Sequence, residues 1–213
     1  MGKYTGVIFD LDGVICFTDK YHYQAWKAVA DKLGIYFDET INNRLRGVSR
    51  MDSLEIILER YEGPELTDTE KQALAERKND LYRTLLGQMS PQDLSSEVKE
   101  TLDALRKKGM KLAIGSSSKN APFILERIGL SNYFDAVADG NCITRSKPAP
   151  EVFLKAAEYL GLSPEDCLVV EDAVAGAEAG HAGGFAVACV GDASQAGAGD
   201  HNLENISQLL NLF

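Results

Sequence analysis

The sequence predicts a doubly wound α/β core with a helical segment inserted near its start. Three observations support this fold class. Short apolar runs such as CLVV at 167–170 are typical of strands buried on both faces of a parallel sheet. In the second half of the chain these runs alternate with helical patterns, as βα units require. From residue 18 to about residue 90, every apolar pattern has helical period and no strand is indicated.

Five apolar runs are the predicted strands. They are TGVIF at 5–9, KLAIG at 111–115, FDAVA at 134–138, CLVV at 167–170 and FAVACV at 185–190. Because these runs are almost continuously apolar, we expect helices to cover both faces of the sheet. The glycine-rich run AGAGD, which follows the last strand, is typical of a flexible loop.

Helical patterns stand between these strands. The segment 95–109 has a serine in the N-cap position and a glycine at its end. The segment 148–162 has proline near its start, where a missing N–H costs nothing. Two further helices are predicted at 120–130 and 173–184, so the second half of the chain has one helix between most pairs of strands.

Three amphipathic helices are predicted in the insertion, at 18–35, 49–63 and 66–89. Their apolar residues recur every three or four positions, which gives each helix one face to bury. A helical bundle inserted after the first strand is the simplest arrangement that satisfies this pattern.

The corresponding domain boundaries place residues 1–15 and 93–213 in the α/β core and residues 16–92 in a helical cap. The chain crosses between the two parts twice, and Thr18 lies at the first crossing. We expect both crossings to act as hinges.

The composition limits the classes of function. The net charge is −10, from 32 acidic and 22 basic residues, and no run of Lys and Arg could follow a nucleic-acid backbone. No segment has the length of a membrane span or the pattern of a signal peptide, so we expect a cytoplasmic protein. Four cysteines without a CxxC pair predict reduced thiols, with neither zinc nor disulfides. If the substrate is an anion, the site should be a positive pocket on a negative body.

Polar and charged residues follow the predicted strands. In an open parallel sheet, ligands bind outside the carboxyl ends of the strands. Asp10 and Asp12 follow the first strand, and because side chains alternate along a strand, both should point to the same side. The other candidates at strand ends and helix starts are Ser116, Ser117, Ser118, Lys119, Asn120, Lys147, Glu171 and Asp172.

Each of these residue types has a role in phosphoryl transfer. Carboxylates supply the oxygen ligands that Mg²⁺ prefers, and the metal offsets their mutual repulsion. Hydroxyls and free N–H groups at a helix start bind phosphate oxygens, and a lysine neutralises charge on the transferring group. One unprotonated aspartate can attack phosphorus, and a second, whose pKa is raised, can hold the proton of the attacking or departing oxygen. The combination is specific, although each motif alone is common.

Four motifs that span nearly the whole chain resemble the successive motifs of the haloacid dehalogenase superfamily. They are FDLDGV, IGSSSK, SKPAPEVF and VVEDAVAG. Within the insertion, the stretches TDKYHYQAWKAVADKLGI, NRLRGVSRMDSLEIIL and ERKND resemble the cap of the β-phosphoglucomutases. The resemblance implies a Rossmann-like core of haloacid dehalogenase type with an inserted α-helical cap domain.

The resemblance implies a phosphomutase that interconverts β-D-glucose 1-phosphate and D-glucose 6-phosphate. An aspartyl phosphate and a bound β-glucose 1,6-bisphosphate would be its intermediates, and Mg²⁺ its cofactor. Its partners would be small sugar phosphates, with no nucleic acid and no membrane, and the inserted cap suggests a monomer.

The resemblance also implies a role for each candidate residue. Asp10 would be the nucleophile and Asp12 the general acid and base. Mg²⁺ would be bound by Asp10, the backbone carbonyl of Asp12 and Asp172, with Glu171 close by or acting through water. The residues that bind the phosphates or lie near the sugar would be Ser116, Ser117, Ser118, Lys119, Asn120, Lys147, Arg50, Arg46, Gly47, Val48, Ser49, His22, Trp26 and Lys78.

Five residues of the predicted cap have a simpler alternative beside the implied role. Arg50 would bind the distal phosphate, and Arg46 would face the sugar, but both could be surface charges flanking a turn. Lys78 would also face the sugar or be simply solvated, and His22 would support Asp12 or be structural. Trp26 fits the core of the cap better than a ligand stack. Arginine at 46 replaces the lysine of the family pattern, which keeps the charge and changes the geometry.

Two other functions stay open at this stage. A sugar-phosphate phosphatase would use the same core, with water in place of a sugar hydroxyl attacking the aspartyl phosphate. A non-catalytic phosphosugar-binding protein is the second alternative. A degenerate site of that kind would be expected to lose Asp10, Asp12, Lys147 or Asp172, and all four are present.

Overall fold

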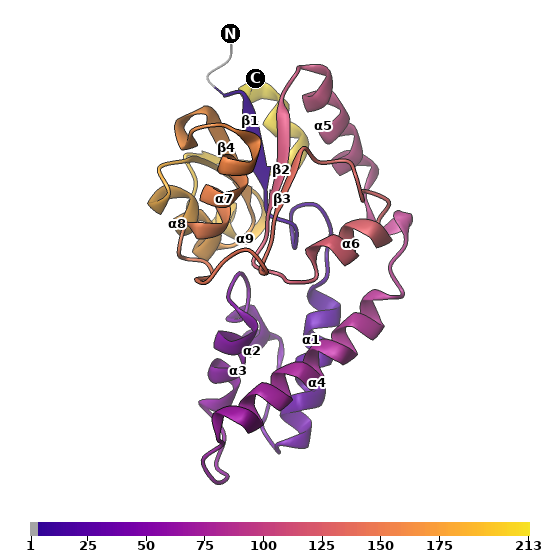
Figure 1. The fold of residues 1–213 in the computed structure, drawn as a ribbon, viewed down its shortest axis with the longest axis vertical. Coiled ribbons are helices and arrows are strands. Elements are labelled where there is room, and N and C mark those ends of the chain that lie inside the picture. Colours follow the sequence, from indigo (N-terminus) through magenta and orange to yellow (C-terminus); the bar gives the residue numbers. More distant parts are fainter. Residues whose placement is uncertain (1–3) are drawn as a thin grey trace.

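The computed structural model describes residues 4–213; residues 1–3 of the predicted core lie outside the described residues. Six parallel strands form one sheet in the order β3-β2-β1-β4-β5-β6. Helices lie on both faces of this sheet, and a separate group of helices lies beyond the carboxyl ends of its strands (Figure 1). This is the doubly wound α/β architecture that the sequence predicts.

Five of the six strands coincide with predicted apolar runs. The sixth, β6, has only two residues, too few for any periodicity, and it follows the predicted loop at 196–200. The bounds are Gly6–Phe9 for β1, Lys111–Gly115 for β2, Ala136–Ala138 for β3, Cys167–Glu171 for β4, Ala186–Cys189 for β5 and His201–Asn202 for β6.

Each face of the sheet is covered by its own helices. Val7 and Phe9 point into one hydrophobic cluster with α5 and α6, whereas Ile8 points into the other with α7 and α8. Alternating burial on both faces explains why the strands are almost continuously apolar. The core helices are α5 Ser96–Lys107, α6 Ala121–Arg127, α7 Glu151–Leu160, α8 Val174–Ala182 and α9 Gly191–Gln195, with short 3₁₀ turns η1 Pro91–Asp93, η2 Pro164–Asp166 and η3 Ile206–Leu212.

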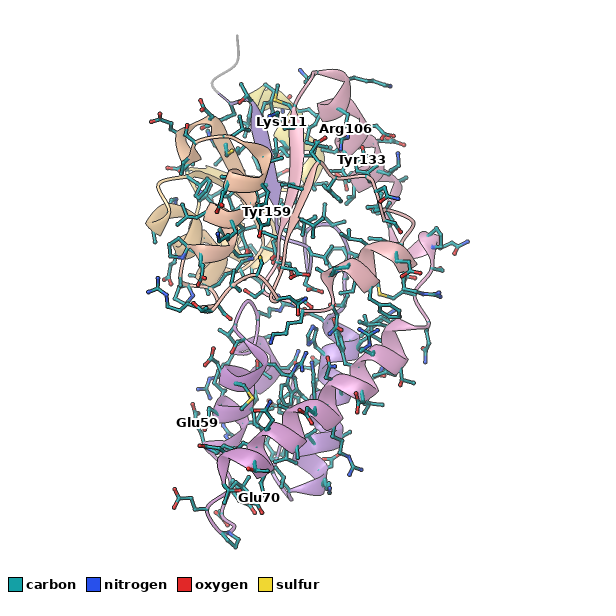
Figure 2. The ribbon with its side chains drawn as sticks, viewed as in Figure 1. Glu59, Glu70, Arg106, Lys111, Tyr133 and Tyr159 are labelled. Carbon is teal, nitrogen blue, oxygen red and sulfur yellow. The ribbon has the colours of Figure 1, made fainter. Side chains whose placement is uncertain are left out.

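The inserted helices form a third hydrophobic cluster of their own, in which Trp26, Leu54 and Ile57 are almost fully buried. We call helices α1 to α4 the helical lobe. Figure 2 shows Glu59 and Glu70 on this lobe and Lys111 at the opposite end of the molecule. The bounds are α1 Asp19–Lys32, α2 Glu39–Asn43, α3 Arg50–Leu58 and α4 Asp68–Leu86; α2 was not predicted.

Strand register brings the predicted site residues together. Phe9 is paired with Ile114 of β2 and with Val170 of β4, so these three strands end at the same edge of the sheet. Asp10 and Glu171 stand at this edge, which faces the helical lobe (Figure 1).

Two further sequence expectations can be compared with the described part of the chain. Among residues 4–213, the four cysteines form no disulfide, as expected. No helix in this range combines the length and the apolar character that crossing a membrane requires.

Candidate active site

A cleft of about 630 Å³ lies between the helical lobe and the carboxyl edge of the sheet. This volume is typical of a small-molecule site. Every residue that the sequence proposed for catalysis, metal binding or substrate binding lines it, whereas the predicted hinge residue Thr18 is fully buried beside it. The structure therefore gathers side chains from both the core and the lobe around one cavity.

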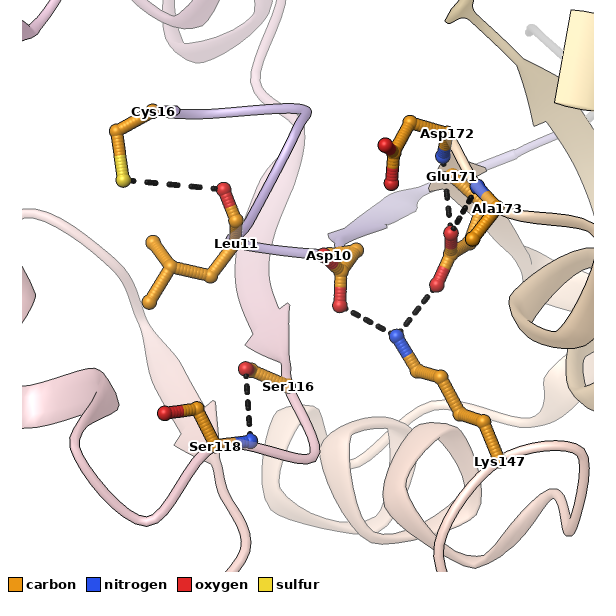
Figure 3. A network of polar contacts seen from close by, with 9 residues as sticks. All are labelled: Asp10, Leu11, Cys16, Ser116, Ser118, Lys147, Glu171, Asp172 and Ala173. Atoms are coloured by element: carbon orange, nitrogen blue, oxygen red, sulfur yellow. Dashed lines mark hydrogen bonds and ion pairs between the residues drawn. The ribbon is translucent and has the colours of Figure 1, made fainter. Parts of the chain in front are cut away.

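An acidic cluster stands at the core end of the cleft. Asp10, Glu171 and Asp172 each offer a carboxylate oxygen, and these oxygens lie within 4.8 Å of one another. Lys147 reaches the cluster from the loop before α7, and its Nζ forms ion pairs with Asp10 and Glu171 (Figure 3). Both of these carboxylates and the ammonium group are almost completely buried, so the charges interact strongly.

Backbone groups fix the side chain of Glu171. One of its carboxylate oxygens accepts hydrogen bonds from the N–H groups of Asp172 and Ala173, both at 2.9 Å (Figure 3). A Cβ at Gly176 would lie 1.9 Å from the other oxygen, so only glycine leaves room for this carboxylate. Glu171 is therefore held by protein groups on both oxygens, with Lys147 on one side and the start of α8 on the other.

The carboxylate of Asp172 has a different environment. No described residue donates a hydrogen bond to it, and a Cβ at position 13 would lie 2.1 Å from its Oδ2. Gly13 has a φ of 94°, a conformation that favours glycine in any case. The turn after β1 thus leaves space for the carboxylate of Asp172, whose oxygens are free to bind a cation. The hard oxygen donors of the cluster suit Mg²⁺.

The protonation of the cluster follows from burial and from its unequal charges. Burial raises the pKa of Asp10 well above its usual value, and Lys147 partly opposes this. Burial, with the charge of Glu171, raises the pKa of Asp172 to about 7. Burial alone would lower the pKa of Lys147, but Asp10 and Glu171 outweigh it and raise this pKa. Three carboxylates and one ammonium group leave negative charge that a divalent cation would compensate.

Asp12 is hydrogen-bonded by Thr18, the last residue before α1. The Thr18 hydroxyl donates to Asp12 Oδ1. Burial raises the pKa of Asp12 to about 6, although the Thr18 hydrogen bond lowers it. The sequence proposed His22 as the support of Asp12, but the His22 Nδ1 instead faces Lys78 Nζ at 2.9 Å. Among the described residues, His22 makes no hydrogen bond to Asp12.

Lys78 is a buried lysine rather than a solvated one. Only 3% of it is exposed, and its Nζ lies 5.0 Å from the ring centre of Trp26 and 4.3 Å from that of Tyr82. Burial and the nearby Arg50 lower the pKa of Lys78 to about 7. Trp26 belongs to the core of the lobe, as expected, and one side of it also lines the cleft.

The segment after β2 forms a polar loop at the start of α6. Ser118 N–H donates to Ser116 Oγ at 3.1 Å, and Asn120 N–H donates to Ser118 Oγ at 3.2 Å. The buried Oγ of Ser117 has no hydrogen-bond partner among the described residues. Lys119 also lines the cleft. This loop can therefore present hydroxyl and ammonium donors to an anion.

Polar contacts connect the lobe to this loop. Asn79 Oδ1 accepts hydrogen bonds from Arg50 Nη2 at 2.8 Å and from Asn120 Nδ2 at 3.0 Å. Arg83 Nη1 donates to Asn120 Oδ1 at 3.0 Å. Neither Asn79 nor Arg83 was predicted from the sequence as a site residue. The only signal for Asn79 was its place directly after Lys78 in the ERKND stretch.

The loop before α3 is less available to a ligand than its sequence suggested. Arg46 forms ion pairs with Asp19 and Asp192, although the sequence placed it against the sugar. The hydroxyl of Ser49 caps α3 by accepting a hydrogen bond from Asp52 N–H at 3.1 Å. Gly47 and Val48 line the cleft between these two residues.

The charge of the cleft differs from the positive pocket that the sequence predicted. Five Lys and Arg residues and six Asp and Glu residues line it. The acidic residues dominate the core end, where the cluster of Asp10, Glu171 and Asp172 could hold a cation. A bound Mg²⁺ would turn this balance positive, which reconciles the cleft with an anionic substrate.

Comparison with known proteins identifies the class. The sequence pattern of the haloacid dehalogenase-like hydrolases matches residues 4–184. The chain belongs to this family and is an enzyme of it.

Individual members of the family are similar to this chain over most of its length. The β-phosphoglucomutase of Bacillus subtilis (strain 168) is 45% identical over 184 residues, which cover 85% of this chain and 81% of the relative. The solved β-phosphoglucomutase of Clostridium difficile has a TM-score of 0.90 at 35% identity, covering 97% of this chain and 93% of that one. A fructose-1-phosphate phosphatase of Escherichia coli (strain K12) is 34% identical over 86% of this chain and 94% of its own. The predicted resemblance is confirmed, and the relatives include both mutases and phosphatases.

Proposed function

We propose that the chain is a phosphomutase that interconverts β-D-glucose 1-phosphate and D-glucose 6-phosphate through an aspartyl phosphate and β-glucose 1,6-bisphosphate. One observation carries this proposal: groups suited to phosphate line the cleft on both the core and the lobe. Lys147 and the loop from Ser116 to Asn120 lie at the core end, and Arg50 reaches in from the lobe. A mutase must hold a second phosphate while the first is transferred, and a hydrolase has no such requirement.

Asp10 would carry the phosphoryl group. In the first transfer, the C6 hydroxyl of glucose 1-phosphate attacks phosphorus, the bond from phosphorus to the Asp10 oxygen breaks, and the hydroxyl proton passes to Asp12. The bisphosphate then reorients in the cleft, so that its C1 phosphate faces Asp10. Asp10 attacks the C1 phosphate, and the departing C1 oxygen takes the proton back from Asp12. A pKa of about 6 suits Asp12 to both steps near neutral pH.

Mg²⁺ would be held by Asp10, the backbone carbonyl of Asp12 and Asp172. Glu171 is already engaged by Lys147 and two backbone N–H groups, which supports a place beside the metal or a contact through water. When bound, Mg²⁺ supplies positive charge that stabilises the transferring phosphoryl group. Lys147 and Ser116, with the neighbouring backbone amides, would bind oxygens of the same group, and the unpartnered hydroxyl of Ser117 belongs to the same loop.

The lobe would act as a cap. We assign residues 16–92 to it and residues 1–15 and 93–213 to the core, with Thr18 at the first hinge. Closure would exclude water, which matters because water competes with the sugar for the aspartyl phosphate. The sugar would lie between the two phosphate sites, near His22, Trp26, Lys78 and Val48. The expected setting is a cytoplasmic monomer that acts on small sugar phosphates.

A sugar-phosphate phosphatase is the second candidate, supported by the 34% identity to the E. coli phosphatase. A coupled assay separates the two. We expect purified protein with β-glucose 1-phosphate, Mg²⁺ and a trace of glucose 1,6-bisphosphate to form glucose 6-phosphate with little inorganic phosphate. Stoichiometric inorganic phosphate without glucose 6-phosphate would exclude the mutase. Running both anomers of glucose 1-phosphate tests the anomer.

The same assay tests the nucleophile. Asp10→Asn should abolish phosphoryl transfer in either reaction, because an amide cannot form the acyl phosphate. The far-ultraviolet circular dichroism spectrum should be unchanged. Activity within tenfold of the wild type would contradict the assignment of Asp10.

A further inference from the structure

Arg46 connects three segments that are far apart in the sequence. Its Nη2 forms an ion pair with Asp19, the first residue of α1. Its Nη1 lies 2.7 Å from Asp192 Oδ2, in α9 of the core. One guanidinium group in the loop before α3 therefore joins the first helix of the lobe to the core, across the edge of the cleft.

Both ends of this bridge lead directly into the active site. On the core side, Ala193 N–H donates to the backbone oxygen of Asp172 at 2.8 Å, so α9 is attached to the acidic cluster. On the lobe side, Asp19 follows Thr18, whose hydroxyl binds Asp12. The bridge thus lies one backbone hydrogen bond from Asp172 on the core side and next to Thr18, the partner of Asp12, on the lobe side.

The guanidinium is committed to these carboxylates rather than open to a sugar. Both of its terminal nitrogens have a carboxylate partner, and its Nε is buried without a hydrogen-bond partner among the described residues. Next to it, a Cβ at Gly47 would lie 3.8 Å from the Cβ atoms of Ala173 and Ala175. The loop that carries Arg46 therefore packs onto the segment that enters α8.

We propose that Arg46 is a positioning residue that clasps the helical lobe to the core on the Asp172 side of the cleft and so limits the loss of the phosphoryl group to water. This inference rests on the proposed function, in which a sugar hydroxyl is the phosphoryl acceptor with which water competes. In the competing reaction, a water oxygen attacks phosphorus, the bond from phosphorus to the Asp10 oxygen breaks, a proton of the water passes to Asp12, and inorganic phosphate leaves. If the lobe turns about its two crossings, the Arg46–Asp192 pair must break before this edge of the cleft opens.

Asp192 gives the sharpest test because it is not part of the cleft lining and its side chain is 63% exposed. We expect Asp192→Asn to raise the ratio of inorganic phosphate to glucose 6-phosphate by about two- to fivefold, the effect of an exposed ion pair. Arg46→Ala should raise it at least as much, and the double variant should not exceed Arg46→Ala, since both remove the same contact.

Glu55→Gln is the matched control. It also neutralises one carboxylate of an exposed ion pair, here with Lys71 at 2.8 Å, but both partners belong to the lobe. Its product ratio should equal that of the wild type. If Asp192→Asn also leaves the ratio unchanged while Arg46→Ala raises KM, then Arg46 is a sugar ligand and the clasp is refuted.

A second measurement does not depend on the identity of the substrate. In the metal-free protein, amide hydrogen exchange in α9 and in the loop 44–49 should be faster in Asp192→Asn than in the wild type or in Glu55→Gln. Unchanged exchange in both segments would overturn the clasp. If instead the wild type makes no glucose 6-phosphate but the exchange result holds, the proposed function fails and the clasp stands.

Discussion

Asp10 and Asp12 are separated by one residue, yet the fold gives them different partners. Asp10 forms an ion pair with Lys147, whose charge partly opposes the rise in the pKa of Asp10 that burial causes. Among the described residues, the side-chain hydrogen bond to Asp12 comes from the neutral hydroxyl of Thr18, and burial raises the pKa of Asp12 to about 6. Paired carboxylates in unlike surroundings can divide one reaction, one as nucleophile and the other as proton carrier.

Replacing Thr18 tests this division. Its hydroxyl stabilises the charged form of Asp12, so Thr18→Val should raise the pKa of Asp12. The acidic limb of the kcat/KM profile for glucose 1-phosphate should then move upward by roughly one pH unit, the effect of one hydrogen bond to a charged group. Profiles from pH 5 to 8.5 measure this. Thr18→Ser keeps a hydroxyl and should resemble the wild type; coincident profiles for both variants would contradict the prediction.

The proposed second phosphate site depends on Arg50, which lines the cleft from the lobe. Arg50→Ala should lower kcat/KM for the bisphosphate by about a hundredfold, because a charge-assisted contact to phosphate is lost. Phosphorylation of Asp10 by acetyl phosphate, which has no distal phosphate, should change by less than about threefold. Arg77→Ala, on the exposed side of α4, is the control. Equal losses on both phosphoryl donors would remove Arg50 from the distal site.

At the scale of elements, the turn after β1 limits where the carboxylate of Asp172 in the acidic cluster can lie. Gly13→Ala would bring a Cβ to 2.1 Å from Asp172 Oδ2, so the carboxylate must move. Gly34 is a matched control, since it also has a positive φ, 70°, but a Cβ there meets nothing within 4 Å. Both alanine variants should lose about 1–2 kcal/mol of folding stability, because a positive φ is strained for alanine.

Only Gly13→Ala should also weaken Mg²⁺ binding, by about ten- to a hundredfold, as expected when a metal ligand is misplaced. Isothermal titration of the two variants with Mg²⁺ distinguishes this effect from backbone strain. Equal Mg²⁺ affinities in the two variants would show that Asp172 is not held by this turn.

The longer strands could be predicted from the sequence, whereas the shortest elements could not. Strands buried on both faces leave near-continuous apolar runs, so β1 to β5 and their carboxyl ends could be predicted, and with them the acidic cluster. The helix α2, the helix α9 and strand β6 are too short for a periodic signal. Elements with no pattern of their own form only because their neighbours provide a surface to pack on.

Contacts that depend on the packing of distant segments could not be predicted from the sequence either. Lys78 stands in a charged stretch of α4, and its burial depends on how α1 and α4 pack together. The Arg46–Asp192 pair joins residues 146 positions apart on different parts of the fold. No local pattern encodes such a pair, because its formation depends on the relative placement of the lobe and the core.

For the whole molecule, the net charge of −10 poses a problem for any anionic substrate. The lysines and arginines of the cleft do not by themselves offset the repulsion of an anion, since the acidic residues of the cleft outnumber the basic ones. The excess lies in the cluster of Asp10, Glu171 and Asp172, where a divalent cation would bind. Metal binding would thus both complete the catalytic site and give the cleft the sign that attracts phosphate.

This coupling predicts how stability depends on pH and Mg²⁺. In the metal-free protein, burial raises the pKa of Asp12 to about 6 and that of Asp172 to about 7, above the unfolded value of about 3.9. The folded state then binds more protons than the unfolded state, so the free energy of unfolding due to these groups falls as pH rises from about 4 to about 7. Bound Mg²⁺ favours the ionised form of Asp172 and should reduce this decline.

The stabilisation by Mg²⁺ should therefore be larger at pH 8 than at pH 5.5, reaching about 2.7 kcal/mol when Mg²⁺ is at a hundred times its Kd. Urea unfolding with Mg²⁺ and with EDTA at both pH values measures the difference. Asp172→Asn should remove most of the Mg²⁺ effect and part of the metal-free pH dependence, whereas Glu62→Gln, at an exposed position, should change neither. A stabilisation by Mg²⁺ that is equal at both pH values would mean that the metal does not bind at the titrating carboxylates. The acidic cluster would then not be the place where a cation makes the charge of the cleft positive.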